Sequence, residues 1–250
     1  ALAALQENVI SKQETIFCSE KYVYGKNRRV MKCHCGGGYR NLFSSISNSC
    51  NSYFAMAFRK TIDKYDNASV GMDVWSDHIK SFGLGNFLGN DLSVGKKGNI
   101  PDGAYYDAWY PDFRWGATTV LSNAIGQGEI LVTPIQLANM TAAIANKGFY
   151  FTPHIIKSIE GESINEKFTE KKETTIHPSY FEPVIEGMHK VYTNGTASFL
   201  KVPGIDICGK TGTAENFTKI DGVKTQLTDH SIFVAFAPKE DPKIAIAVLV

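Results

Sequence analysis

Apolar side chains recur with helical periodicity in several parts of the chain, and the clearest example lies between Thr133 and Gly148. Thr133 can cap a helix, Pro134 suits its first turn, and Gly148 after Lys147 is typical of a helix end. The pattern therefore predicts a helix that begins at Thr133-Pro134 and ends at Lys147-Gly148. The same periodicity predicts further helices over residues 1–10, Ser52–Tyr65, Val74–Phe82 and Pro178–Tyr192.

Apolar, β-branched runs gather near the end of the chain. Residues 231–238 and 244–250 are separated by turn residues and predict two adjacent strands, and residues 149–158 predict another. Helices in the middle of the chain, with strands gathered at one end, favour an α+β fold over a βαβ repeat. Three long segments remain. Residues 16–44 predict an irregular excursion, and residues 83–117 an ordered loop around a cleft. Residues 159–176 predict a polar hairpin or loop.

The composition is that of an ordinary globular protein. The chain has 250 residues, of which 43% are hydrophobic and 20% charged, enough for one sizeable core. Its net charge of +1 gives no basic footprint for nucleic acid. No apolar run approaches the roughly 20 residues that span a bilayer, and no signal peptide is visible. Ala1–Gln6 begins inside an apolar helical pattern and Val250 lies inside a strand-like run, so we expect a domain truncated at both ends.

The most informative motif is Lys210-Thr211-Gly212. The lysine offers a compact positive charge, the threonine hydroxyl can bind a carboxylate, and the glycine lets a substrate backbone lie close to a strand. A lone Lys-Thr-Gly triplet is more often only the end of a strand, so a functional interpretation depends on the other motifs in the chain. These are Ser49-Cys50-Asn51 and the block Ser122–Pro134, which contains Gly126-Gln127-Gly128. Ser49 could equally be a cap for the helix predicted from Ser52.

In this order, the motifs resemble those of the transpeptidase domain of class B penicillin-binding proteins, most closely the penicillin-binding protein 2 group of cell elongation. The resemblance covers nearly all of residues 1–250. It implies the fold shared with serine β-lactamases, an antiparallel sheet flanked by helices, here truncated at both ends. It also implies a location on the periplasmic face of the bacterial inner membrane, with the anchor outside this chain.

The resemblance further implies a serine-type peptidoglycan D,D-transpeptidase that helps to set cell shape. A serine attacks the D-Ala-D-Ala carbonyl of a stem peptide, D-Ala leaves, and an amine of a neighbouring strand takes the acyl group. β-Lactam antibiotics inhibit such enzymes by acylating the same serine. Ser49 would relay protons and Asn51 would hold the substrate amide. Lys210, Thr211, Gly212 and Thr213 would bind the substrate carboxylate and backbone, with Lys210 also counted as catalytic.

The nucleophile of this family belongs to a Ser-x-x-Lys motif a few residues ahead of an apolar stretch that Ala1–Gln6 resembles. Ser198–Lys201 has the spacing but lies just before Lys210, out of the family's order. We therefore expect the acylated serine within about a dozen residues upstream of Ala1, on the same helix. Residues 1–250 would then form a partial transpeptidase domain that is inactive on its own.

The resemblance implies partners as well: the stem peptide, β-lactams, a glycan-strand polymerase and other proteins of the elongation complex. Two alternative functions stay open. The domain could bind β-lactams without turnover, as a sensor or a scaffold for wall-synthesis partners. A serine β-lactamase is the third possibility, although such enzymes are usually more compact between the Ser-x-Asn and Lys-Thr-Gly motifs than the 159 residues found here (210 − 51).

Four cysteines fall early in the chain at equal spacing, Cys18 to Cys33 and Cys35 to Cys50, each 15 residues apart. One interpretation is a structural zinc site with these four ligands, or with His34 as an alternative ligand. The other is one or two disulfides, which the oxidising periplasm implied by the resemblance would allow. Some members of the penicillin-binding protein 2 group carry a metal site here. The fifth cysteine, Cys208, is expected to be a small buried residue.

Overall fold

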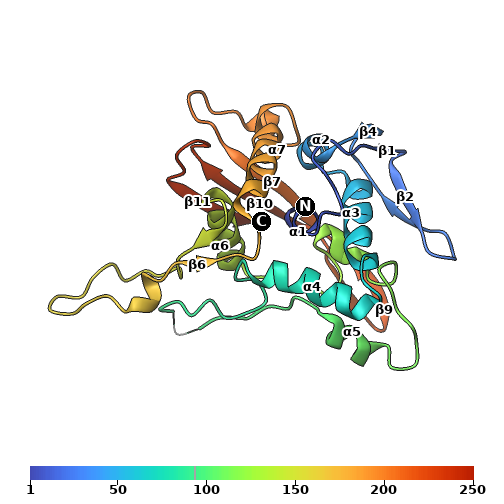
Figure 1. The fold of residues 1–250 in the computed structure, drawn as a ribbon, viewed down its shortest axis with the longest axis horizontal. Coiled ribbons are helices and arrows are strands. Elements are labelled where there is room, and N and C mark those ends of the chain that lie inside the picture. The colour runs from blue at the N-terminus through green and yellow to red at the C-terminus, as the bar shows by residue number, and fades with distance from the viewer. Residues whose placement is uncertain (93) are drawn as a thin grey trace.

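The computed structural model describes residues 1–92 and 94–250, with the backbone alone for residues 217, 219, 220 and 224. Ser93, within the loop predicted at 83–117, lies outside the described residues. The strands and helices form the α+β fold that the sequence predicts (Figure 1). No helix in the described part of the chain is both long and apolar enough to cross a membrane.

The central sheet is antiparallel, in the order β11-β10-β7. β7 (Cys208–Ala214) carries the Lys-Thr-Gly motif, and β10 (His230–Ala237) pairs with it so that Val234 lies opposite Lys210. β11 (Ile244–Leu249) lies on the other side of β10. β7 therefore forms an edge of this sheet among the described residues. The other strands form two-stranded pairs: β1 (Ile16–Cys18) with β4 (Gly38–Arg40), β2 (Lys21–Tyr24) with β3 (Arg29–Lys32), β5 (Phe149–Tyr150) with β6 (Lys172–Glu173), and β8 (Phe217–Ile220) with β9 (Val223–Gln226).

Helices cover one face of the central sheet and continue away from it. Two of them, α6 and α7, face the same side, because Ile144 of α6 and Val184 of α7 line one cavity with Val234 of β10. The α-helices are α1 (Leu2–Gln6), α2 (Leu42–Ser47), α3 (Asn51–Asp63), α4 (Ala68–Lys80), α5 (Gly103–Trp109), α6 (Pro134–Ala145) and α7 (Phe181–Thr193). The 3-10 helices are η1 (Leu121–Ile125), η2 (Glu166–Phe168), η3 (Pro178–Tyr180) and η4 (Ser198–Leu200).

The predicted helix after Thr133 is confirmed in detail. The Thr133 hydroxyl accepts from the backbone N–H of Gln136, and the Gln136 side chain accepts from the backbone N–H of Thr133. This reciprocal pair satisfies two of the donors that every helix start leaves free. The Gln136 amide also donates to the carbonyls of Asn86 and Lys97, so the same residue ties the helix start to the loop before it.

Other predictions were wrong in their boundaries or missed an element. The helix predicted from Val74 begins at Ala68, where Asn67 provides the cap that the sequence interpretation overlooked. The loop predicted at 83–117 contains α5, which Asp102 caps by accepting from the Tyr105 N–H. The segment 16–44, interpreted as irregular, holds the four short strands β1 to β4.

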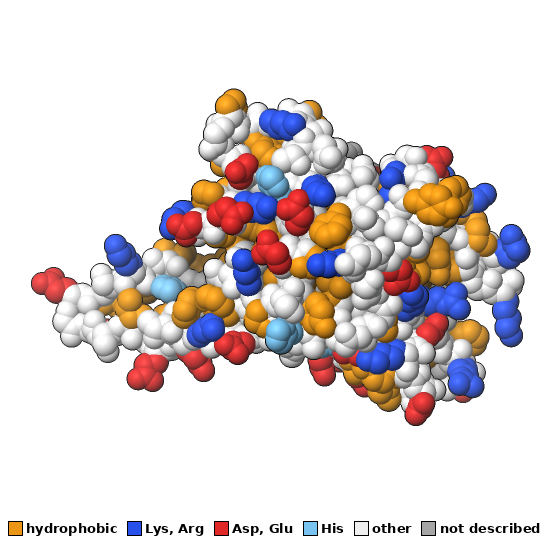
Figure 2. All heavy atoms as spheres, turned by 45° about the horizontal axis from the view of Figure 1, so that its top comes forward, with side chains coloured by type: hydrophobic (Ala, Val, Ile, Leu, Met, Phe, Trp, Pro, Cys, Tyr) orange, Lys and Arg blue, Asp and Glu red, His pale blue; other side chains and the backbone are white. Residues whose placement is uncertain are grey.

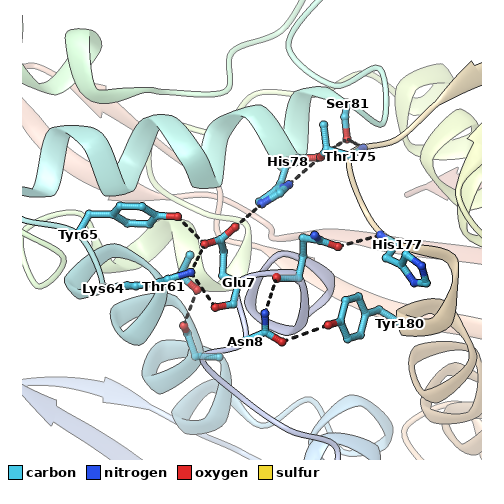
Figure 3. Close-up of polar contacts among 12 residues, drawn as sticks. Glu7, Asn8, Thr61, Lys64, Tyr65, His78, Ser81, Thr175, His177 and Tyr180 are labelled. Atoms are coloured by element: carbon cyan, nitrogen blue, oxygen red, sulfur yellow. Dashed lines mark hydrogen bonds and ion pairs between the residues drawn. The ribbon is translucent and has the colours of Figure 1, made fainter.

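A partly buried polar network fixes the end of α1 against the helices around it (Figure 3). Glu7 follows α1 and forms an ion pair with Lys64 at 2.6 Å; its carboxylate also lies 3.0 Å from the Nε2 of His78 and accepts from the hydroxyl of Tyr65. On its far side, the His78 ring contacts the hydroxyl of Thr175 at 2.7 Å. Glu7 therefore joins the ends of α3 and α4 to the chain that leaves the apolar helix at residues 2–6.

We expect Glu7→Gln to destabilise the protein at neutral pH. Burial alone would raise the pKa of Glu7, but hydrogen bonds from His78, Lys64 and Tyr65 outweigh it and lower that pKa from 4.5 to about 2. This shift corresponds to about 3 kcal/mol of stability, fully present above pH 4.5 and lost as the pH falls towards 2. Urea unfolding at pH 7 and pH 3 measures it. The variant should lose about 2–3 kcal/mol at pH 7 and much less at pH 3, whereas Glu240→Gln, at an exposed site, should change neither value.

Candidate active site

The turn between α2 and α3 brings Ser49 to the Lys-Thr-Gly strand. Ser49 has a φ of +52°, in the left-handed region that non-glycine residues seldom adopt. Its hydroxyl oxygen is in direct hydrogen-bond contact with the Lys210 Nζ, although 161 residues separate the two in the chain. The N-cap position of α3 belongs to Cys50. Ser49 therefore meets Lys210 and is not the helix cap that the alternative interpretation proposed.

Lys210 lies on β7 and is partly shielded from solvent. Its Nζ also donates to the carbonyl of Thr211 at 2.7 Å. Burial lowers the pKa of Lys210 from 10.5 to about 8, because an apolar environment disfavours the charged form. A lysine with this pKa can hold an anion as an ammonium group, and it can also pass a proton to the neighbouring Ser49 hydroxyl near neutral pH.

Beside this pair lies a cavity of about 450 Å³ with a largely apolar lining. It extends between α1, α3, α4, α6 and the inner face of β7 and β10. Its polar lining residues include Lys210, Thr211 and Asn123, and Gly212 and Gly126 also border it. Because the walls of this cavity are mostly apolar, the Lys210 ammonium group is poorly solvated there.

The two threonines of the motif lie near other polar groups. The hydroxyl of Thr211 is 2.8 Å from the hydroxyl of Thr196, which belongs to the turn after α7. The Gln127 amide of the Gly-Gln-Gly block donates to the carbonyl of Thr213 at 3.4 Å. The block at 126–128 and the Lys-Thr-Gly strand are therefore neighbours in the fold, as expected for two motifs of one active site.

Gly212 lies at a position where the folded chain itself has room for a side chain. A Cβ there would lie 3.6 Å from its closest described neighbour outside the strand, the Cβ of Ile232, which is an ordinary contact distance. Gly209 on the same strand is different, because a Cβ there would be 2.8 Å from the Phe233 ring. Packing accounts for Gly209, whereas the glycine at 212 suits the close approach of a ligand backbone to the edge of β7.

Asn51 does not join the Ser49–Lys210 pair. It is the first residue of α3, and its amide donates to the carbonyl of Lys32 on β3 at 2.9 Å. Its expected role in holding a substrate amide stays a prediction. A different asparagine borders the cavity: Asn123 is 2% exposed, and its amide donates to the hydroxyl of Tyr106 at 2.6 Å. Tyr106 lies on α5, the helix that the sequence pattern did not predict, and Asn123 lies on η1.

The four early cysteines form one cluster, as their spacing predicts. The sulfur atoms of Cys18, Cys33, Cys35 and Cys50 all lie within 4.8 Å of one another, are buried, and are not linked by disulfides. The Cys33–Cys50 and Cys35–Cys18 sulfur pairs are 3.8 Å and 3.5 Å apart. A tetrahedral zinc with zinc–sulfur bonds of about 2.3 Å needs sulfur separations of about 3.8 Å, so the donor set fits such an ion.

The alternative ligand His34 lies outside this cluster. Its side chain is exposed, while Cys33 and Cys35 on either side are buried. Both cysteines therefore turn inward and the histidine turns outward. The expectation that His34 could replace a cysteine is therefore corrected. Cys208 is buried apart from the cluster, as expected.

Burial and nearby hydrogen-bond donors change the pKa values of the clustered thiols. Burial raises the pKa of the thiols of Cys18 and Cys50. Burial also opposes ionisation of Cys33, but backbone N–H groups of Ser52 and Cys35 outweigh it and hold the pKa of that thiol at about 7. The Arg40 Nε donates to the Cys35 sulfur at 3.5 Å. A divalent cation bound by the four sulfur atoms would favour their thiolate forms and balance the negative charge that these carry.

Comparison with known proteins decides the family. The chain matches the family model of the penicillin binding protein transpeptidase domain over residues 1–250. The chain belongs to this family. It is 30% identical to the peptidoglycan D,D-transpeptidase MrdA of Haemophilus influenzae, an alignment that covers 100% of this chain and 39% of that protein. The chain thus spans about two fifths of the length of this curated relative.

Solved structures give the same result. The Pseudomonas aeruginosa PBP2 in complex with WCK 5153 is 28% identical and superimposes with a TM-score of 0.82, over 100% of this chain and 51% of that one. The PBP2 of Helicobacter pylori in its complex with MreC is 26% identical, with a TM-score of 0.76 over 100% and 43% of the two chains. The family, the fold and the resemblance to the penicillin-binding protein 2 group that the motifs predicted are confirmed.

Proposed function

We propose that this chain is part of a peptidoglycan D,D-transpeptidase that cross-links stem peptides during cell elongation and that β-lactams inhibit. The contact between Lys210 and Ser49 is the observation that carries the proposal. It unites two motifs far apart in the chain, beside a cavity and at an open strand edge, which is what acyl transfer to and from a peptide requires.

In this proposal a stem peptide lies along the edge of β7, opposite β10. The backbone of Gly212 leaves room for it, and the Lys210 ammonium with the hydroxyls of Thr211 and Thr213 binds the carboxylate of the terminal D-Ala. The backbone N–H of Thr213 would form half of an oxyanion hole. Ser49, in contact with Lys210, would pass a proton towards the leaving D-Ala.

The attacking serine is proposed to lie in a Ser-x-x-Lys motif upstream of Ala1. The first turn of α1 supports this, because Ala1, Leu2, Ala3 and Ala4 line the same cavity as Lys210 and Gly212. A helix that continued upstream from α1 would lie next to the proton relay. The enzyme would work at the periplasmic face of the inner membrane with a glycan-strand polymerase and elongation proteins, and the complex of a related PBP2 with MreC supports the latter.

We also propose a structural zinc on Cys18, Cys33, Cys35 and Cys50. The fit of the sulfur separations to a tetrahedral ion supports it. Bound there, zinc would hold the end of β1 and the segment after β3 against the start of α3. Cys50 directly follows Ser49, so the ion would stabilise the turn that presents the Ser49 hydroxyl to Lys210.

A cross-linking assay tests the main proposal. The complete protein, supplied with newly polymerised glycan strands that carry pentapeptides, should produce dimeric muropeptides and release D-Ala, and penicillin should stop both. Release of D-Ala without dimers would indicate a carboxypeptidase instead. Acylation by penicillin with neither product would favour the alternative of a sensor or scaffold.

Gly212→Ala should slow acylation without weakening the fold. The added methyl group has room within the protein but would crowd a ligand on β7. Overpacking of this kind costs about 1–3 kcal/mol, which is about fivefold to a hundredfold in rate. Gly209→Ala is the matched control, because its Cβ would clash with Phe233 and should lower the melting temperature. Fluorescent penicillin labelling and thermal unfolding measure the two effects. An equal rate of labelling for Gly212→Ala and the parent would contradict the proposed approach of the substrate.

A further inference from the structure

The hairpin formed by β2 and β3 concentrates positive charge. Between Lys21 and Lys32 the chain has five basic residues, Lys21, Lys26, Arg28, Arg29 and Lys32, and no acidic residue, although the whole chain carries a net charge of only +1. All five side chains are exposed. In Figure 2, basic side chains protrude at the right-hand edge of the molecule, the end that this hairpin forms in Figure 1.

The ion pairs of the described residues do not involve these five cations. Within the part of the chain that the structure describes, none of them forms an ion pair with a carboxylate. Arg40, by contrast, contacts the cysteine cluster through Cys35 and is not part of this surface. The hairpin therefore presents its charge to the solvent.

The register of the hairpin sharpens this point. Lys21 lies directly opposite Lys32, and Val23 opposite Val30, so like charges face each other on the outer side, an arrangement that weakens strand pairing. The inner side, with Tyr22 and Met31, packs against the core and is what holds the hairpin in place. Folding does not account for the outer lysine pair, whereas an anionic ligand would.

The hairpin is also connected to the active-site turn. The carbonyl of Lys32 accepts from the amide of Asn51, the first residue of α3. Cys33, the residue directly after β3, lies in the cysteine cluster together with Cys50, the neighbour of Ser49. A ligand on the hairpin would thus lie on an element fixed directly to the catalytic motif.

Exposed aromatic rings accompany this charge. Phe17 of β1 and Tyr39 of β4 meet edge to face with their ring centres 5.3 Å apart, and they are 65% and 75% exposed. These two strands precede and follow the hairpin in the chain. Aromatic surfaces of this kind can pack against the apolar faces of sugar rings, while the lysines and arginines bind carboxylates.

We propose that the β2–β3 hairpin is a second binding site for peptidoglycan, which engages the peptide carboxylates of a glycan strand away from the reacting peptide. This inference rests on the proposed function, because that function supplies a polymer with many carboxylates as the substrate. Charge complementarity selects this occupant: a strand held by one peptide in the cleft can place its further carboxylates on the hairpin. Holding the polymer at two points raises its effective concentration at the cleft.

The test compares two variants of the complete protein with equal loss of charge. The first changes Lys21, Lys26, Arg29 and Lys32 to Gln. The control changes four exposed lysines elsewhere, Lys96, Lys97, Lys157 and Lys201, to Gln. Binding to purified, insoluble peptidoglycan is measured by co-sedimentation at low and physiological salt, after penicillin has blocked the cleft. Binding to phosphatidylglycerol vesicles and the rate of penicillin acylation are measured in parallel.

The hairpin variant should bind peptidoglycan about tenfold more weakly, since four exposed charge contacts of modest strength are lost. The control should stay within about twofold of the parent, and both variants should acylate at the parental rate. Equal binding of the two variants to peptidoglycan would overturn the inference, as would a loss of vesicle binding alone, which would assign the hairpin to an anionic membrane surface. Failure of the parent to be acylated would instead refute the proposed function, and the sedimentation would still report on the hairpin.

Discussion

Replacing Lys210 with alanine in the complete protein should slow acylation by penicillin about tenfold to a hundredfold. A hydrogen bond to a charged group contributes about 1.5–3 kcal/mol, and loss of such a contact in the transition state lowers the rate by this factor. Lys210 is proposed to provide this contact to the carboxylate that substrate and β-lactam share, and it is already in contact with Ser49. Time courses of fluorescent penicillin labelling provide the rate.

The pH dependence of the parent adds a second test of the same residue. Burial lowers the pKa of Lys210 to about 8, so the ammonium form that binds a carboxylate disappears as the pH rises through 8. Acylation should therefore decline above this pH, and Lys210→Ala should remove that decline. Lys201→Ala, at an exposed position nearby in the sequence, serves as the control and should label like the parent. A parental rate for Lys210→Ala would refute the assigned role.

Removal of zinc should weaken both the fold and the active-site turn. Protein purified without added metal should contain about one zinc per chain, and after chelation in denaturant all five cysteines of residues 1–250 should react as free thiols. Because structural zinc binding contributes about 10 kcal/mol or more in small domains, chelation or Cys35→Ser should lower the melting temperature clearly. Acylation should also slow, since Cys50 adjoins Ser49.

Cys208→Ser is the matched control for this experiment, because Cys208 is buried but lies outside the cluster. It should keep the full zinc content. Protein with no metal and no free thiols among the four clustered cysteines would contradict the zinc proposal and establish disulfides instead.

Local sequence signals predicted the features that depend on capping residues or on the spacing of cysteines. Thr133 and Pro134 marked a helix start that the structure reproduces with a full capping box. The equal spacing of the cysteines predicted their meeting, which the cluster confirms. The spacing could not tell that His34 points outward, because this depends on the backbone conformation at residues 33–35.

Elements stabilised by tertiary contacts were harder to predict. α5 lies in a stretch rich in Gly and Pro, and its cap Asp102 was the signal that could have found it. The β2–β3 hairpin was read as irregular, although the alternation of Tyr22, Val23 and Tyr24 before a turn was a strand signal. The contact of Ser49 with Lys210 joins residues 161 positions apart, and only the resemblance to a known family brought them together in advance.

The location of the acyl group after reaction with penicillin tests the central claim most directly. The complete protein is incubated with a β-lactam and digested, and the modified residue is identified by mass spectrometry. We expect one acyl group per chain, on the serine of a Ser-x-x-Lys motif upstream of Ala1, in a protein whose Lys210→Ala variant reacts slowly at that same serine. An acyl group on Ser49 or on another serine of residues 1–250, or no acylation at all, would contradict the proposed site.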